Sequence, residues 1–216
     1  MAIGPLHVEW LSALRAKAVI PDGAAVLDLG PQDVQVSREY LAAVALRHLA
    51  EASAREVIDR MFDGATPRPD CQPAFYQLFG AATYASLDAV DPRATYRMDL
   101  NDPVRALGPF EVVTNFGSLE HVFDIGQAFR WLHRVVRPGG ISLHAMPCFA
   151  FVDHGFYNVH PCFFYEFARA NAYEVADIHY VDNFYARNKV PSLRGAEALP
   201  LPTFRSRSPP RWRRGT

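Results

Sequence analysis

Hydrophobic and polar residues alternate along this chain in blocks that predict strands and helices in turn. Short apolar runs of the kind found in strands occupy 24–29, 83–87, 95–98, 110–115 and 141–145. Apolar residues recur every three or four positions, the spacing of one helix face, over 6–18, 37–62, 124–136 and 161–170. This alternation predicts an α/β fold, with a doubly wound, mostly parallel sheet that carries helices on both faces.

Two regions depart from a regular alternation. Residues 37–62 are long for one crossover helix, so we expect a break near 51–54 and an inserted helical segment over about 37–80. Residues 173–181 alternate like a strand, and beyond 188 the pattern dissolves into proline, serine and arginine. We expect one domain over 1–190, with its last strand missing or altered, and a disordered Pro/Arg-rich tail over 191–216.

Composition narrows the classes of partner. The net charge is −1, and five of the 22 basic residues are arginines in the tail, at 205–214, where no acid stands beside them. A mildly acidic body argues against nucleic acid or a membrane surface as partner and favours a small molecule. The three cysteines form no CxxC pair, and no signal-peptide pattern or 18-residue apolar run occurs. We therefore expect a soluble, cytoplasmic protein.

Four of the predicted strands end in a polar side chain or are followed directly by one, namely Asp28, Asp88, Asp99 and Asn115. In a parallel sheet the carboxyl ends of the strands line one crevice, where ligands of doubly wound folds bind. An acid at the end of the second strand suits a ribose, because one carboxylate accepts hydrogen bonds from two hydroxyl groups. The sequence thus predicts a nucleoside-bearing ligand at this edge.

The turn after the first strand discriminates between cofactors. A dinucleotide requires close backbone approach to its pyrophosphate, hence three glycines in GxGxxG. Here Gly30 is followed by Pro31 and Gln32, and proline has no N–H to donate to a phosphate. This turn argues against a nicotinamide-dependent reductase and is compatible with a sulfonium cofactor that has no phosphate.

Several segments together resemble the class I S-adenosylmethionine-dependent methyltransferases. Residues 26–30 look like the first motif of this family, Asp88 resembles its ribose acid, and 98–100 resemble the segment that contacts adenine. Residues 110–122 and 132–140 are similar to its fourth-strand motif and its helix-then-PGG signature. The resemblance implies a Rossmann-like methyltransferase fold and S-adenosyl-L-methionine as cofactor, bound by Asp28, Gly30, Gln32, Asp88, Asp99, Leu100 and Asn115.

The reaction that this resemblance implies is methyl transfer to an oxygen or nitrogen atom of a small metabolite, such as a sugar or a natural-product intermediate. A second hypothesis is a degenerate, non-catalytic relative that acts as a binding or scaffold protein. Its support is the single glycine at Gly30 and the absence of a clear final hairpin in the last residues.

Candidate residues for the methyl acceptor lie in 144–160, which holds three histidines and four aromatic residues after the fifth strand. Methyl transfer requires a nucleophile held in line with the sulfonium and a base for the acceptor's proton. His154 and His160 are the candidate bases, with Tyr157 as an orienting group. Alternatively, His160 caps the helix at Pro161 and His154 is a turn residue.

A metal site is not predicted. Glu120 and His121 resemble a pair that binds a divalent ion in ubiquinone-type O-methyltransferases, together with a glutamate four residues before the histidine. Here that earlier position is Gly117. A zinc site drawn from the histidines and cysteines of 144–162 lacks any standard spacing.

Overall fold

The computed structural model describes residues 2–149, 151–181 and 197–198. Its central sheet has five strands in the order β5-β4-β1-β6-β7, and all neighbouring pairs are parallel. The strands are β1 (Ala24–Leu29), β4 (Ala81–Asp88), β5 (Tyr96–Arg97), β6 (Phe110–Phe116) and β7 (Val136–Ala145). Along the chain this is the order third, second, first, fourth, fifth, which confirms the doubly wound prediction.

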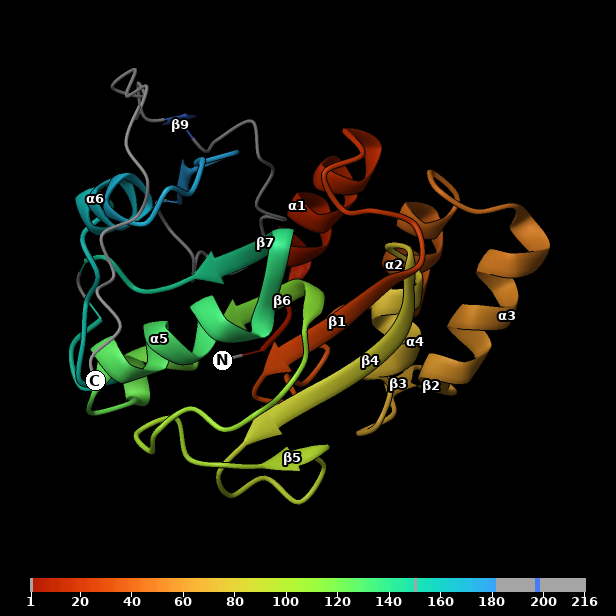
Figure 1. Cartoon of the computed structure of the whole chain (residues 1–216). Coiled ribbons are helices and arrows are strands. Elements are labelled where there is room, and N and C mark those ends of the chain that lie inside the picture. The colour runs from red at the N-terminus through yellow and green to blue at the C-terminus, as the bar shows by residue number, and fades with distance from the viewer. Residues whose placement is uncertain (1, 150, 182–196, 199–216) are drawn as a thin grey trace.

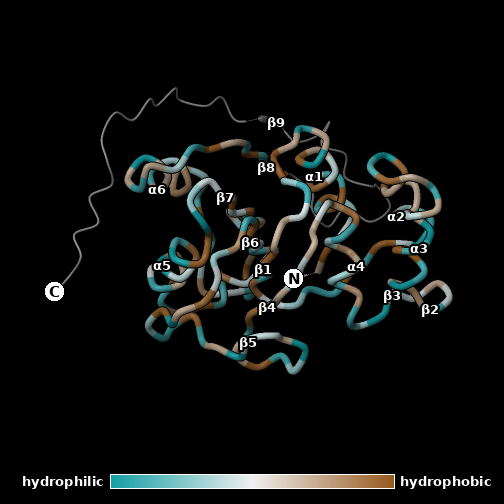
Figure 2. Tube along the Cα trace, turned by 45° about the vertical axis from the view of Figure 1, so that its right-hand side comes forward, coloured by the Kyte–Doolittle hydropathy of each residue, from teal (hydrophilic) through white to brown (hydrophobic). Residues whose placement is uncertain are grey.

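Helices cover both faces of the sheet (Figure 1). They are α1 (Pro5–Ala16), α2 (Arg38–Ala45), α3 (Glu51–Met61), α4 (Gln72–Gln77), α5 (Ile125–Val135) and α6 (Cys162–Ala170). Val26 and Val112 belong to one core cluster with α1 to α4, whereas Leu27 and Val113 belong to a second cluster with α5. Successive side chains of a strand point to opposite faces, so each strand contributes to both cores. Figure 2 shows hydrophobic residues along these central strands and hydrophilic stretches on the outer helices.

The inserted segment between β1 and β4 is helical, as predicted, with shifted boundaries. The break lies at 46–50, between α2 and α3, and α4 begins at residue 72. After α3 the chain forms a small antiparallel hairpin of β2 (Phe62–Asp63) and β3 (Thr66–Pro67). Ser37 caps α2, because its side chain accepts a hydrogen bond from Tyr40 N. This segment carries the chain across one face of the sheet.

The helix predicted over 124–136 forms as α5, but the strand after it begins five residues earlier than predicted. Asp124 is the N-cap of α5, and its carboxylate accepts a hydrogen bond of 2.8 Å from Gln127 N. The helix ends at Val135, and β7 begins with the next residue, so the Pro-Gly-Gly sequence lies inside the strand. Gly140 permits close strand approach there, because a Cβ would lie 2.9 Å from the carbonyl oxygen of Glu111.

The end of the described chain differs from expectation. Of the strand predicted over 173–181, only β8 (His179–Tyr180) forms, paired antiparallel with β9 (Glu197–Ala198). At the start of this segment the Tyr173 ring stacks on Phe167 of α6, and its hydroxyl lies 2.8 Å from His133 Nδ1. The predicted tail over 191–216 lies outside the described residues apart from 197–198, so the domain boundary stays a prediction. Among the helices that the structure describes, none combines the length and apolar character needed to cross a membrane.

Candidate cofactor and acceptor site

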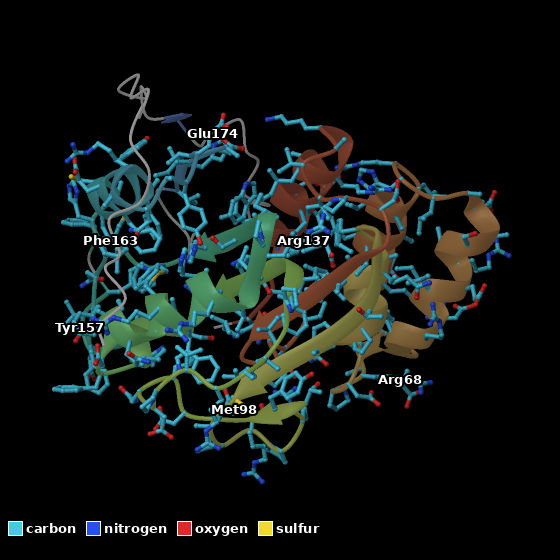
Figure 3. The ribbon with its side chains drawn as sticks, in the orientation of Figure 1. Arg68, Met98, Arg137, Tyr157, Phe163 and Glu174 are labelled. Carbon is cyan, nitrogen blue, oxygen red and sulfur yellow. The ribbon has the colours of Figure 1, made fainter. Side chains whose placement is uncertain are left out.

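The carboxyl ends of β1, β4 and β5 meet at one edge of the sheet, as predicted. Gly30 N donates a hydrogen bond of 2.9 Å to Leu87 O, and Met98 N donates one of 3.2 Å to Asp88 O. Figure 3 shows Met98 at the end of the sheet toward which the strand arrows point, and Arg137 near the opposite end. The structure therefore brings the predicted residues Gly30, Asp88 and Asp99 to the same side of the molecule.

Gly30 holds the turn after β1 open. Its φ is +83°, and a Cβ there would lie 2.8 Å from Ser118 Oγ and 3.7 Å from Asp88 Oδ2. Ser118 is fixed in this position because its hydroxyl donates to the carbonyl of Leu29. Only glycine accommodates both the backbone conformation and the close approach. One glycine is thus sufficient for this turn, although the family usually has more.

The carboxylate of Asp88 has one oxygen engaged by its own turn. Oδ1 accepts hydrogen bonds from Val90 N at 2.8 Å and Asp91 N at 2.9 Å. Its Oδ2 faces Gly30 and makes no hydrogen bond within the described residues. Asp99 is exposed, and its Oδ1 accepts two hydrogen bonds of 2.8 Å from Asn101. Leu100, next in the chain, is 7% exposed and packs against the α5 side of the sheet.

Gln32 presents a second acceptor beside Gly30. Its side chain is almost fully buried, and its Nε2 donates a hydrogen bond of 3.2 Å to Ser118 Oγ. Its Oε1 is buried and has no hydrogen-bond partner in the part of the chain that the structure covers. A buried acceptor left unsatisfied is unfavourable by about 1–3 kcal/mol. A donor supplied by a ligand would remove this penalty.

Arg93 connects the loops of this edge, and no motif in the sequence singles it out. Its guanidinium pairs with Asp33 at 2.6 Å and with Asp91 at 2.7 Å, and donates to the carbonyl of Pro31 at 3.0 Å. The hydrogen bonds that the guanidinium donates to the Asp91 carboxylate are the main cause of the raised pKa of Arg93. Arg93 lies in an aperiodic polar loop, so only the folded structure reveals that it clamps the turn after β1.

Asp28 lies behind this edge, inside the sheet. Its carboxylate is fully buried and accepts hydrogen bonds from Thr114 Oγ1 at 2.7 Å and from the Tyr84 hydroxyl at 3.4 Å. The Tyr76 hydroxyl of α4 lies 2.9 Å from Thr114 Oγ1, and its ring stacks on Tyr84. Burial raises the pKa of Asp28 to about 7, although these hydrogen bonds oppose the shift. Asp28 is therefore part of an internal polar network.

Asn115 is also fully buried and shapes the turn after β6. Its Oδ1 accepts hydrogen bonds from Ser118 N at 3.1 Å and Leu119 N at 3.0 Å. Its Nδ2 lies 3.3 Å from His144 Nδ1. Burial lowers the pKa of His144 to about 4, so this imidazole is neutral near pH 7. The turn after β6, which Asn115 stabilises, places Ser118 beside Gly30.

The candidate residues for the acceptor occupy different environments. His154 Nε2 lies 3.4 Å from Oε1 of Glu120. Glu120 follows directly after the turn that holds Ser118. The Tyr157 hydroxyl donates a hydrogen bond of 2.5 Å to the carbonyl of Phe123. His160 accepts one of 3.1 Å at Nδ1 from Cys162 N, as expected of a residue that caps α6. His154 is thus the candidate that faces another titratable side chain.

A cavity of about 320 Å³ lies along β7, between α1 and α6. Its wall includes Trp10, Leu143 and Phe164. Neither Gly30 nor Asp88 contributes to this wall, so the cavity is separate from the edge described above.

Comparison with known proteins gives a family match for part of the chain and a similar solved structure. Residues 80–143, from the start of β4 into β7, match a family model described as a methyltransferase domain. A crystal structure of Burkholderia thailandensis 1,6-didemethyltoxoflavin-N1-methyltransferase, with bound 1,6-didemethyltoxoflavin and S-adenosylhomocysteine, is similar at 15% identity and a TM-score of 0.46, over 80% of this chain and 70% of that one. Among curated proteins, no sequence matches. The methyltransferase family predicted from the sequence thus has a match over residues 80–143, the segment that holds Asp88 and Asp99.

Proposed function

We propose that this protein transfers a methyl group from S-adenosyl-L-methionine to an oxygen or nitrogen atom of a small metabolite. The observation that carries the proposal is a pair of acceptors near Gly30, Asp88 Oδ2 and Gln32 Oε1, which accept no hydrogen bond from any residue that the structure describes. They lie at the carboxyl ends of β1 and β4, beside the point where the strand order reverses, which is where doubly wound folds bind ligands.

Each end of the cofactor has a proposed partner at this edge. Asp88 Oδ2 accepts from the ribose hydroxyl groups, while Asp99 and Leu100 contact the adenine. Gln32 Oε1 accepts from the ammonium group of the amino-acid end, which passes over Gly30. Asp28 and Asn115 act on the cofactor through the turns that they hold, since both side chains are buried in the protein.

On the acceptor side, the methyl group leaves sulfur as the C–S bond breaks and a new C–O or C–N bond forms, and the acceptor releases a proton. We propose that His154, beside Glu120, contacts the methyl acceptor and that Tyr157 orients it. His160, at the start of α6, is a further candidate for contact with the acceptor. Phe123 and Phe156, 73% and 65% exposed, pack edge to face near these groups. Such aromatic surface favours an acceptor with an apolar body, such as a natural-product intermediate, over a free sugar.

Calorimetric titration of the full-length protein with S-adenosyl-L-methionine tests the proposal. We expect saturable 1:1 binding in the wild type and about 30-fold weaker binding in Asp88→Asn, because a hydrogen bond to a charged group contributes about 2 kcal/mol. Asp63→Asn, an exposed acid on the β2 hairpin, is the matched control. The absence of binding heat in the wild type would contradict the proposal. Binding without turnover on any acceptor would instead favour the non-catalytic, scaffold-like alternative.

Cytoplasmic location and the absence of nucleic-acid partners stay predictions. The free thiols of Cys71, Cys148 and Cys162 are consistent with a reducing compartment.

A further inference from the structure

We propose that Glu120, His121 and His154 bind a divalent transition-metal cation, with Zn²⁺ as the preferred ion. One ligand atom from each side chain can be chosen such that all three lie within 4.8 Å of one another. The sequence predicted no metal, because it offered no third ligand near Glu120 and His121. In the folded chain the third ligand comes from the loop after β7.

The first observation is the state of the Glu120 carboxylate. The residue is 0% exposed, and neither carboxylate oxygen makes a hydrogen bond to any residue that the structure describes. Its one ion-pair contact among these residues is His154 Nε2 at 3.4 Å, and this nitrogen also lacks a hydrogen bond. A buried carboxylate without hydrogen bonds is strongly unfavourable unless a positive charge compensates it. A cation between the carboxylate and the imidazoles would supply that charge.

The second observation is that the backbone fixes His154 in place. Glu120 and His121 lie in the short 3-10 helix η1 (Leu119–His121) that follows β6. The Glu120 carbonyl accepts hydrogen bonds from Phe156 N at 2.8 Å and Tyr157 N at 3.3 Å, which folds the His154 turn onto η1. A Cβ at Gly155 would lie 2.9 Å from this carbonyl oxygen, so glycine permits the contact. The three ligands are therefore held together before any ion binds.

The donor set indicates which ion fits. One carboxylate oxygen with two imidazole nitrogens is a common protein ligand set for catalytic zinc, with further positions left for water or substrate. Mg²⁺ and Ca²⁺ prefer all-oxygen surroundings, and imidazole favours zinc and its neighbours. Glu120 lies at the buried base of the cluster, whereas His121 is exposed, so an ion has access from solvent. Glu120 comes two residues after Ser118. A cation here would therefore lie on the side of the site that we propose for the methyl acceptor.

Zinc titration of the full-length, EDTA-treated protein tests this site, in the absence of S-adenosyl-L-methionine. We expect one Zn²⁺ per chain by calorimetry and elemental analysis, no comparable binding of Mg²⁺, and an intense visible absorption after substitution with Co²⁺. Glu120→Gln and His154→Asn should each weaken zinc binding at least about tenfold. His160→Asn, a histidine of the same loop outside the cluster, should bind zinc like the wild type.

Two outcomes would overturn the proposal: a wild type that takes up no stoichiometric zinc, or zinc affinity unchanged in the cluster variants. His121→Asn replaces an exposed side chain and keeps the test valid if Glu120→Gln fails to fold. Because the readout is metal binding without cofactor, its failure is distinguishable from the failure of the proposed methyl transfer.

Discussion

Two buried carboxylates in this protein have opposite surroundings. Asp28 and Glu120 are both 0% exposed. Asp28 accepts hydrogen bonds from Thr114 and Tyr84, and two tyrosine rings close the network around it. Glu120 accepts no hydrogen bond at either oxygen from the described residues, and faces His154. The first carboxylate is satisfied by the fold, whereas the second retains unused capacity to bind a cation.

The same contrast separates the interior of the sheet from its carboxyl edge. Inside, Asn115 is satisfied by the backbone of its own turn. At the edge, Gln32 Oε1 and Asp88 Oδ2 have no hydrogen-bond partner among the described residues. Buried polar groups are normally paired within a protein, so the buried Gln32 Oε1 indicates where a ligand is expected, and the half-buried Asp88 Oδ2 lies on the same side of the molecule.

The largest expected effect concerns the internal network. The pKa of Asp28 is about 7 in the folded protein, against an ordinary carboxyl value of 3.8 in the unfolded chain, so between these two pH values only the folded state holds the proton. Stability of the wild type should therefore fall as pH rises from 4 to 7 on account of this group, by up to about 4 kcal/mol. Asp28→Asn removes this dependence.

Urea unfolding at pH 4 to 8 measures this difference. The free energy of unfolding of Asp28→Asn minus that of the wild type should increase with pH, whereas Asp63→Asn should parallel the wild type. A difference that stays constant across this range would mean that Asp28 is ionised in its network.

Gly30→Ala is expected to have the next largest effect. An alanine at φ +83° costs about 1–2 kcal/mol of stability, and its methyl group would reach Ser118 and the space in front of Asp88. Gly64 is the matched control, because its φ is +59° and a Cβ there meets nothing within 4 Å. Both variants should lose stability in thermal unfolding, but only Gly30→Ala should lose S-adenosyl-L-methionine binding. Equal binding by the two variants would place the cofactor elsewhere.

Gln32→Leu should have the smallest effect. Loss of one hydrogen bond to the amino-acid end of the cofactor corresponds to about 1 kcal/mol, or about fivefold weaker binding of S-adenosylhomocysteine. Methylthioadenosine lacks the amino-acid end, so its affinity should not change. Competition binding with the two compounds measures both values, and a similar loss for both would assign Gln32 a merely structural role.

Much of the fold could be predicted because its signals are local. Apolar runs and helical periodicity depend on neighbouring residues, and each of the five predicted strands of the sheet overlaps an observed one, although β7 begins five residues earlier than predicted, at Val136. The alternation at 173–181 misled the prediction, because only His179–Tyr180 pair in a sheet, whereas Tyr173 packs against α6 and α5. Periodicity cannot distinguish these two arrangements.

The site was predictable only in part. Gly30 and Asp88 lie at the carboxyl ends of two parallel strands. Because such ends share one edge of the sheet, the α/β pattern was sufficient to predict that these two residues belong to the site. The inward direction of Asp28 had a signal in the sequence, since it shares a strand face with Val26. The contact between Glu120 and His154 had none, because it depends on how the loop after β7 folds back onto η1.

The most direct test of the central claim is a crystal structure of the full-length protein with S-adenosylhomocysteine. The ribose hydroxyl groups should lie within hydrogen-bond distance of Asp88 Oδ2, with the ammonium group at Gln32 Oε1 and the amino-acid end over Gly30. Density for the ligand in the cavity along β7, with the edge at Gly30 and Asp88 vacant, would contradict the account.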